Sequence, residues 1–364
     1  MFHLIEDNYI VRFVFDLITF FIGFLLLIYI LNVKKVKGKL NYIFIISFFS
    51  PLFLNNFLFD WTYFLDQSKY LFIAQSIRNL NFDLIKDINS ALLLPGTIYS
   101  LFPTPVIYSF STISIIARFL FLIVLIFVHK KYLKDKVVLF FLLFCPSIIL
   151  YTSIGLRETF LFSFLILIFF YLEKHKINYV LILVSLLTLT KPEFGFMIIL
   201  SLLGYYLYFF NKKNYFKLIS LLLVPVIFIL FSDNILEYIN KRYAGYYHEE
   251  FSIFPKIYEN FFDLFITLPN AFLQFMVSPL FQITNFFRFF QSIENLFIYI
   301  YLLLYFKLCF TKNKLKTLYW FIILFLNLSI YSIVVINPGS IARYKITLFL
   351  FIILSLKHFT KKNV

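Results

Sequence analysis

The stretch 104-TPVIYSFSTISIIARFLFLIVLIFV-128 is almost entirely apolar, and its only charged residue is Arg118. A helix of about 20 such residues crosses the ~30 Å hydrocarbon core of a bilayer. Similar runs recur along the chain of 364 residues, of which 62% are hydrophobic and only 14% are charged. A soluble domain carries about 25% charged residues. The sequence therefore predicts an all-α integral membrane protein, a polytopic bundle of helices.

The chain contains no polar stretch long enough for a separate soluble domain, so residues 1–364 are interpreted as one transmembrane domain. The net charge of +15 lies in short clusters between apolar runs, which argues against nucleic-acid binding. The two cysteines, Cys145 and Cys309, define neither a disulfide framework nor a metal-ligand spacing. Neither a Walker motif, a GxGxxG motif nor an HExxH motif occurs, and no cofactor or metal is expected.

Lysine clusters recur at nearly every second junction between apolar runs. Cytoplasmic loops of membrane proteins are enriched in basic residues, so we place all six clusters in the cytoplasm. Together they hold twenty of the 33 basic residues. The clusters are Lys34-Lys35-Lys37-Lys39, Lys130-Lys131-Lys134-Lys136, Lys174-Lys176, Lys212-Lys213-Lys217, Lys307-Lys312-Lys314-Lys316 and Lys357-Lys361-Lys362.

This orientation predicts eleven spans, with the N-terminus outside and the C-terminus inside. The predicted outer side includes an amphipathic segment at about 60–100 and a loop at about 233–263. Segment 262–289 contains Pro269 and Pro279, and a crossing there would move the later lysines to the wrong side, so we expect an interfacial or re-entrant segment. The predicted spans are 13–33, 40–58, 104–128, 137–153, 157–173, 177–191, 194–211, 218–232, 290–307, 317–336 and 346–358.

All twenty predicted cytoplasmic charges are lysine, and the seven arginines lie elsewhere. A surface charge can be either residue, whereas a planar fork for phosphate or carboxylate must be arginine. We therefore expect four arginines to converge on one outward-facing, anion-binding cavity: Arg118, Arg157, Arg288 and Arg343. The other three are Arg12, Arg78 and Arg242.

The first candidate catalytic residues are Asp60 and Asp66, which follow the second predicted span. A carboxylate at the mouth of a span is able to accept a proton from a sugar hydroxyl. The stretch from Asp66 to Arg78 is predicted to form an amphipathic helix at the membrane interface. The alternative is that both acids only cap helices.

A second group of candidates lies at two predicted outer turns. Arg157 and the candidate catalytic residue Glu158 begin the span at 157–173, where adjacent charges are costly without a role. Lys191 and Glu193 flank Pro192 at the next outer turn and are candidate substrate-binding residues. The alternatives are a local ion pair at the first turn and an ordinary helix start at the second.

Further candidate substrate-binding residues lie near the C-terminus. Arg343 and Lys345 enter the last predicted span, where a guanidinium and an ammonium suit a lipid-linked pyrophosphate. Arg288 and Glu294 bound an outer-side segment that lines a cleft or faces lipid headgroups. Snorkelling to the interface is the alternative for the two basic residues of the last span.

Arg118 lies in the middle of its predicted span, where an arginine costs about 2.5–3.5 kcal/mol on insertion scales. It must therefore face the interior of the bundle with a partner, and Asp16 of the first span is a candidate. A buried structural pair and a contact with substrate are both open.

At this point the chain resembles bacterial polysaccharide-assembly glycosyltransferases of the GT-C type, including Wzy-type O-antigen and capsule repeat-unit polymerases. The resemblance covers most of the chain as a pattern of spans and motifs. It is carried by Asp60 and Asp66, the run P-(x)10-R-E from Pro146 to Glu158, the segment 269–294 ending in Ile293-Glu294-Asn295, and the closing Asn337-x-Gly339-(x)3-Arg343-Tyr344.

The resemblance implies transfer or polymerisation of polyprenyl-(di)phosphate-linked sugars on the outer face of the bacterial cytoplasmic membrane. An acid, Asp60 or Asp66, would activate the acceptor hydroxyl, and Arg157, Arg343 and Lys345 would hold the departing diphosphate. The implied partners are the lipid-linked sugar, membrane lipids and other polysaccharide-assembly proteins. The main outer loop of about thirty residues is short for a polymerase, which keeps a single-sugar transferase open. A flippase or transporter is the alternative from another class.

Overall fold

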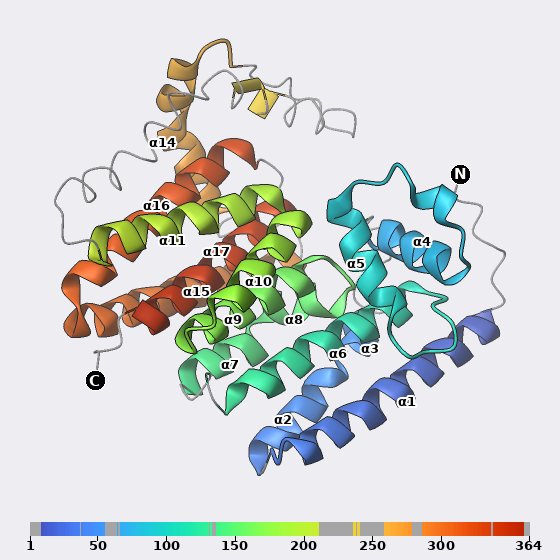
Figure 1. The fold of residues 1–364 in the computed structure, drawn as a ribbon. Helices are drawn as coiled ribbons and strands as arrows, with labels where there is room; N and C mark the ends of the chain where they lie inside the picture. Colours follow the sequence, from blue (N-terminus) through green and yellow to red (C-terminus); the bar gives the residue numbers. More distant parts are fainter. Residues whose placement is uncertain are drawn as a thin grey trace. The chain divides into compact units, whose positions relative to one another are not determined.

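The structure is a computed structural model. It describes residues 9–36, 38–54, 64, 66–130, 132, 136–210, 236–237, 239–240, 258–278, 286–335 and 338–359. The regular elements of these residues are helices (Figure 1). The chain forms two compact units, residues 1–195 and 196–364.

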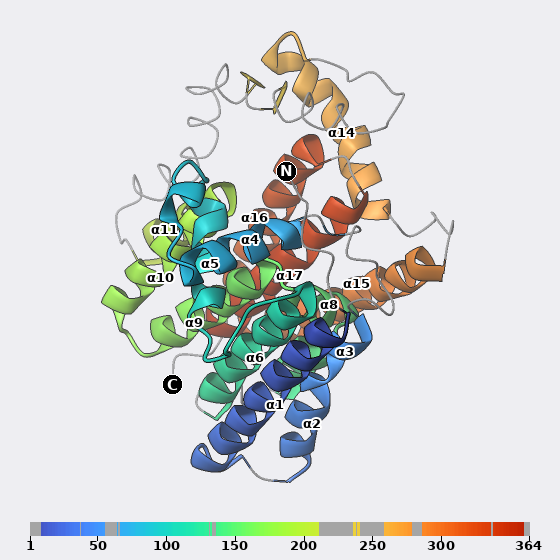
Figure 2. The same cartoon turned by 90° about the vertical axis from the view of Figure 1, so that its right-hand side faces the viewer.

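In the first unit, α1 (Tyr9–Val33) packs against α2 (Lys39–Phe48) and α6 (Phe110–His129). Figure 2 shows these three helices side by side. A turn around Gly38, at a φ of 69°, separates α1 from α2, and α2 is followed after Phe49 by the short α3 (Ser50–Leu54). Phe49 keeps helical backbone angles, so Lys39–Leu54 forms one short apolar helical segment within the described part of the predicted span 40–58.

Polar side chains join α1 to α6 inside this apolar layer. Asp16 accepts hydrogen bonds from Ser109 Oγ and, at 2.6 Å, from Thr112 Oγ1. Ser109 is the N-cap of α6, so the carboxylate lies at the positive end of the helix dipole. The expected pairing of Asp16 with Arg118 is wrong, because neither the contacts of Asp16 nor those of Arg118 include the other residue.

The predicted helix from Asp66 to Arg78 is confirmed as α4 (Asp66–Arg78), which packs on α5 (Ser90–Ser100) after the short helix η2 (Phe82–Ile85). The Arg78 guanidinium donates hydrogen bonds to three backbone carbonyls: from Nε to Ser100 O at 2.8 Å, and from its terminal nitrogens to the oxygens of Phe102 and Thr104. It therefore closes the last turn of α5 and the loop that leads to α6.

Four further helices complete the first unit: α7 (Lys136–Phe144), α8 (Pro146–Ser153), α9 (Glu158–Glu173) and α10 (Ile177–Thr190). The predicted span 137–153 is split at Cys145, because Pro146 begins a new helix. The nine residues of α7 reach only about 14 Å, half of a bilayer core. The axes of α8 and α9 then differ by 116°. We call residues 154–157, between these two helices, the elbow.

The second unit contains most of α11 (Pro192–Phe210), with α14 (Phe261–Val277), α15 (Phe286–Lys312), α16 (Lys314–Val334) and α17 (Pro338–Phe359). A capping box between Asn260 and Asp263 begins α14 inside the predicted interfacial segment 262–289. The predicted span 218–232 and most of the loop 233–263 lie outside the described residues.

Among the described residues, six helices are long and apolar enough to cross a membrane, and the bent pair α8–α9 makes a seventh if it counts as one span. The six are within α1, α6, α11, α15, α16 and α17. The described part of the chain is therefore all-helical, and its long apolar helices indicate a membrane protein. The number of eleven spans and their orientation stay predictions.

Replacing Gly155 with alanine is expected to destabilise the elbow. Gly155 has a φ of 66°, and an added Cβ would lie 2.5 Å from Ile113 Cγ2 of α6. The left-handed backbone and the overlap together should cost about 3 kcal/mol. Thermal unfolding in detergent measures the effect, and Ile113→Ala in the same chain should recover part of it.

Gly38→Ala is the matched control, because Gly38 has a similar φ of 69° but nothing within 4 Å of the added Cβ. It should cost only the backbone strain, about 1 kcal/mol. Equal losses for the two variants would contradict the close packing of the elbow on α6.

Candidate functional site

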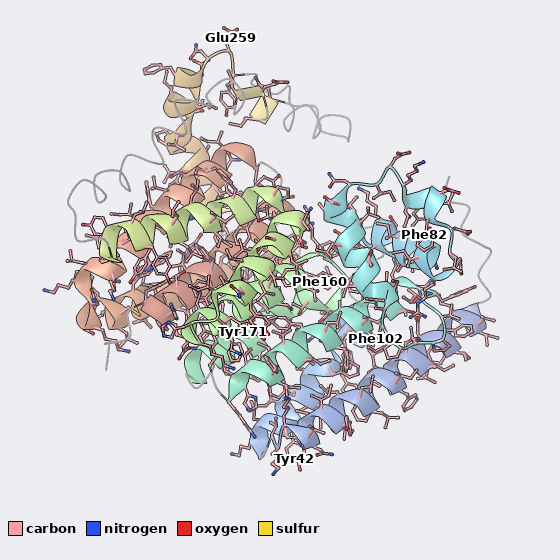
Figure 3. The ribbon with its side chains drawn as sticks, viewed as in Figure 1. Tyr42, Phe82, Phe102, Phe160, Tyr171 and Glu259 are labelled. Carbon is pink, nitrogen blue, oxygen red and sulfur yellow. The ribbon has the colours of Figure 1, made fainter. Side chains whose placement is uncertain are left out.

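The helical hairpin of α9 and α10 brings four of the predicted site residues to one end of the first unit. Because α9 and α10 are antiparallel and joined by residues 174–176, the start of α9 and the end of α10 are neighbours. Figure 3 labels Phe160 near this end of α9 and Tyr171 near the other. The four residues are Arg157, Glu158, Lys191 and Glu193. We call this end of the hairpin the charged end.

Two of the four charged residues at this end are deeply buried. Glu158, the first residue of α9, and Lys191, the residue that follows α10, are each 1% exposed. Arg157 is the half-buried N-cap of α9. Burying an ionised group is unfavourable unless other groups compensate it, so such positions are concentrated at functional sites and buried ion pairs. The positive end of the α9 dipole favours the charged form of Glu158.

Two buried tyrosines, Tyr99 of α5 and Tyr70 of α4, pack against each other near Glu158. The hydroxyl of Tyr99, at the end of α5, donates a 3.1 Å hydrogen bond to the Leu156 carbonyl in the elbow. The Tyr99 ring lies 5.1 Å from that of Phe160 and 6.4 Å from that of Tyr70. Burial, followed by the nearby Tyr70 and Glu158, raises the pKa of Tyr99 well above its ordinary value. Tyr99 therefore stays protonated and remains a donor.

The first turn of α4 carries further polar side chains close to Tyr70. Gln67 and Tyr70 are buried on the face of α4 that packs on α5. Asp66 begins α4 one turn before Tyr70, and its carboxylate lies 3.7 Å from the Lys69 ammonium. The other predicted outer acid, Asp60, lies outside the described residues.

Arg118 lies deeper in the first unit and is fully buried, with an exposed fraction of 0%. Its Nε donates to the Ser47 carbonyl at 3.1 Å. Its terminal nitrogens donate to Ser47 Oγ and to Thr152 Oγ1. Arg118 therefore connects the end of α2 to the last turn of α8, which precedes the elbow.

In the second unit, Lys345 of α17 is 1% exposed and binds the end of α14. Its ammonium donates to the Met276 carbonyl at 3.1 Å, to the Ser278 carbonyl, and to Tyr299 Oη at 3.2 Å. The Tyr299 hydroxyl donates in turn to the Met276 carbonyl at 2.7 Å. An ammonium has three N–H donors, so contact with a phosphate would require Lys345 to give up one of these bonds.

The remaining candidates also lie in the second unit. Arg343 is half-buried two residues before Lys345, and Glu294 is buried on α15 five residues before Tyr299. Arg288 belongs to the first turn of α15. Of the four arginines expected to converge, Arg118 and Arg157 therefore belong to one unit and the other two to the second. Their convergence on one cavity stays a prediction.

Several residues that build the site are not indicated by any sequence pattern. Tyr99 is one of 26 tyrosines, and Ser47 and Thr152 are hydroxyl residues inside apolar runs. None carries a local pattern that distinguishes it. The one available signal was indirect, since a mid-span arginine requires partners on neighbouring helices.

The chain matches no protein-family model, and neither a curated protein nor a solved structure is significantly similar to it.

Tyr99→Phe is expected to destabilise the first unit by about 1–3 kcal/mol, because the buried Leu156 carbonyl loses its donor while the ring packing remains. Thermal unfolding in detergent measures the change. Tyr179→Phe is the control, because Tyr179 is half exposed on α10 and should leave stability within about 0.5 kcal/mol. An equal effect of the two variants would contradict the anchoring role of Tyr99.

Lys345→Met is expected to loosen α14, since two backbone carbonyls at its end lose a charged donor. Hydrogen exchange measured by mass spectrometry should rise selectively over 270–278. Lys314→Met, at the exposed start of α16, serves as the control. Unchanged exchange over α14 in Lys345→Met would show that these bonds do not hold the helix.

Proposed function

We propose that this chain is a membrane glycosyltransferase that polymerises polyprenyl-(di)phosphate-linked sugar units on the outer face of the bacterial cytoplasmic membrane. The observation that carries the proposal is the charged end of the hairpin, where Glu158 and Lys191 are both buried. Such a site offers a carboxylate for proton transfer beside cations for a leaving diphosphate.

In the proposed reaction, an acceptor hydroxyl attacks the anomeric carbon of the lipid-linked sugar. The bond from that carbon to the phosphate oxygen breaks, and the lipid diphosphate leaves. The hydroxyl proton passes to a carboxylate, for which Glu158, Asp66 and Asp60 are the candidates. Arg157 and Lys191 would neutralise the charge that develops on the diphosphate, and a bidentate guanidinium contact suits Arg157 to that role.

The proposed orientation follows from the lysine clusters. Lys174 and Lys176 lie at the opposite end of the α9–α10 hairpin from Glu158. If basic loops are cytoplasmic, the charged end faces outward. The full proposed topology has eleven spans, with the N-terminus outside and the C-terminus inside.

Residues of the second unit are proposed as further substrate-binding residues. Arg343 and Arg288 are proposed to hold phosphate oxygens, with Glu294 near the sugar. Lys345 of the second unit and Glu193 of the first stay candidate substrate contacts on the same basis. A flippase would need charged groups that serve both sides of the membrane in turn. The one-sided charges of the proposed topology favour an enzyme instead.

Deletion of the gene, followed by gel analysis of surface glycans, tests the proposal. Loss of a polymerase should leave single repeat units on the lipid carrier or on the core. Chains of normal length that lack one sugar would instead identify a single-sugar transferase. Units that accumulate on the cytoplasmic side of the membrane would identify a flippase. An unchanged glycan profile would contradict all three functions.

Glu158→Gln should reduce polymer formation by about 10²-fold or more, because an amide cannot accept the proton. The control is Glu173→Gln, which changes the same residue type at the opposite end of α9 and should keep polymer length. Both variants are expressed in the deletion strain and compared by gel. Full polymer formation by Glu158→Gln would exclude Glu158 as the base.

Arg157→Lys and Arg343→Lys should each abolish polymer while the protein still inserts, because lysine keeps the charge but loses the fork. Membrane fractionation checks insertion, and the glycan gel checks product. Full activity in both variants would refute the proposed binding of phosphate by these arginines.

A further inference from the structure

All three guanidinium nitrogens of Arg118 donate hydrogen bonds to oxygens of Ser47 and Thr152, and none of these bonds involves a carboxylate. Arg118 lies in the middle of α6, and its guanidinium is buried with an exposed fraction of 0%. The desolvation of this charge is offset by oxygen acceptors of Ser47 and Thr152. Such an arrangement is costly for a residue that only fills space, because an apolar side chain would pack there without a charge.

The two residues that Arg118 joins belong to separate helices. Ser47 is the second-last residue of α2, two residues before its C-cap Phe49. Thr152 is the second-last residue of α8, two residues before the elbow begins. The chain continues from α2 and α3 toward Asp60 and Asp66, and from α8 through the elbow to Arg157 and Glu158. One guanidinium thus connects the two helix ends from which the candidate acids follow.

A parallel contact supports the same junction. Ser50 Oγ donates to the Ser47 carbonyl at 2.9 Å, and Ser50 Oγ lies 2.7 Å from Ser153 Oγ. Thr152 Oγ1 also donates to the Ile148 carbonyl at 2.6 Å, so its hydrogen is used and its lone pairs are available to Arg118. The acceptors of Arg118 are therefore held in place by their own hydrogen bonds.

The same helix also fixes the elbow. Ile113, five residues before Arg118 on α6, fills the space beside Gly155 in the elbow. The elbow thus contacts α6 at Gly155 and α5 at Leu156 through Tyr99, and the Arg118 junction holds Thr152 of α8 just before it. Only the Arg118 junction also includes the end of α2.

We infer that Arg118 is a positioning residue, which holds the end of α2 against the end of α8 and thereby fixes the elbow that leads to Glu158. The expected effect of Arg118 on the reaction rests on the proposed function, whereas its role in holding the two helix ends does not. Arg118 itself does not touch substrate, because its side chain is buried and each of its three nitrogens donates to a protein oxygen. A lysine would keep the charge and lose the fork that reaches both helices.

The chain offers a covalent replacement for this junction. Cysteines at the positions of Ser50 and Ser153, whose side chains touch, are expected to form a disulfide when the membranes are oxidised. This bond joins α3 to α8 without a guanidinium. Loss of reactivity toward a maleimide reports its formation. The single variants Ser50→Cys and Ser153→Cys, and the reduced pair, are the matched controls.

The experiment compares Arg118→Lys with and without the cysteine pair in membranes of the deletion strain. The substrate is the lipid-linked glycan extracted from that strain, and rates are normalised to folded protein. Arg118→Lys should lower the saturating rate by about 10²-fold with little change in the half-saturating amount of extract. In the oxidised pair, the saturating rate should be about tenfold or more above that of Arg118→Lys alone. The reduced pair and both single cysteines should restore none.

Two kinetic outcomes would overturn the inference. An unchanged rate per folded molecule in Arg118→Lys would show that the residue serves folding only. A disulfide that forms without restoring the rate would show that the guanidinium itself is needed by the substrate. Failure of the cysteines to pair under oxidation would also contradict it, because the start of α3 and the end of α8 would then not be neighbours.

Hydrogen exchange over 150–158, measured without substrate, separates this inference from the proposed function. Exchange should rise in Arg118→Lys and return to the wild-type level in the oxidised pair. If wild-type membranes make no polymer, the proposed function fails, while the exchange result still decides whether Arg118 holds the elbow. Equal exchange in wild-type and Arg118→Lys protein would reject the positioning role by itself.

Discussion

The first unit depends on one constraint: the charge of Arg118 must be satisfied inside an apolar helix. No carboxylate among its described contacts does so, and the oxygens of Ser47 and Thr152 do. These acceptors lie near the ends of α2 and α8, and both helices pack on α6. Arg118 therefore joins two helix ends that are about one hundred residues apart in sequence, and the turn that leads to Glu158 follows one of them.

A membrane interior makes such hydrogen bonds effective in holding helices together. Helices in lipid gain little from burying apolar surface against one another, so close packing and interhelical polar contacts decide their arrangement. The first unit uses both kinds of contact. Asp16 binds the N-terminus of α6, Thr19 and Thr104 meet with their hydroxyl oxygens 2.6 Å apart, and Gly155 allows α6 to approach the elbow. The rigid elements then carry the charged end of the α9–α10 hairpin.

The sequence predicted what depends on local pattern. The helix Asp66–Arg78 and the hairpin at 157–191 were accessible from hydrophobic runs, Gly155 and the basic turn, and the hairpin explains why Glu158 and Lys191 share one end. Partners across helices were not accessible: Arg118 was expected to meet Asp16, because a charge is easier to recognise than hydroxyls such as Ser47. The predicted span 137–153 is split because Pro146 starts a new helix inside a continuous apolar run.

The central claim is that the charged end of the hairpin binds the diphosphate of a lipid-linked sugar. Its most direct test is an experimental structure of the protein in lipid with a polyprenyl diphosphate sugar bound. The account predicts phosphate oxygens within hydrogen-bonding distance of the Arg157 guanidinium, at the start of α9, and of the Lys191 ammonium, at the end of α10. A diphosphate bound instead at the opposite end of the hairpin, beside Lys174 and Lys176, would contradict it.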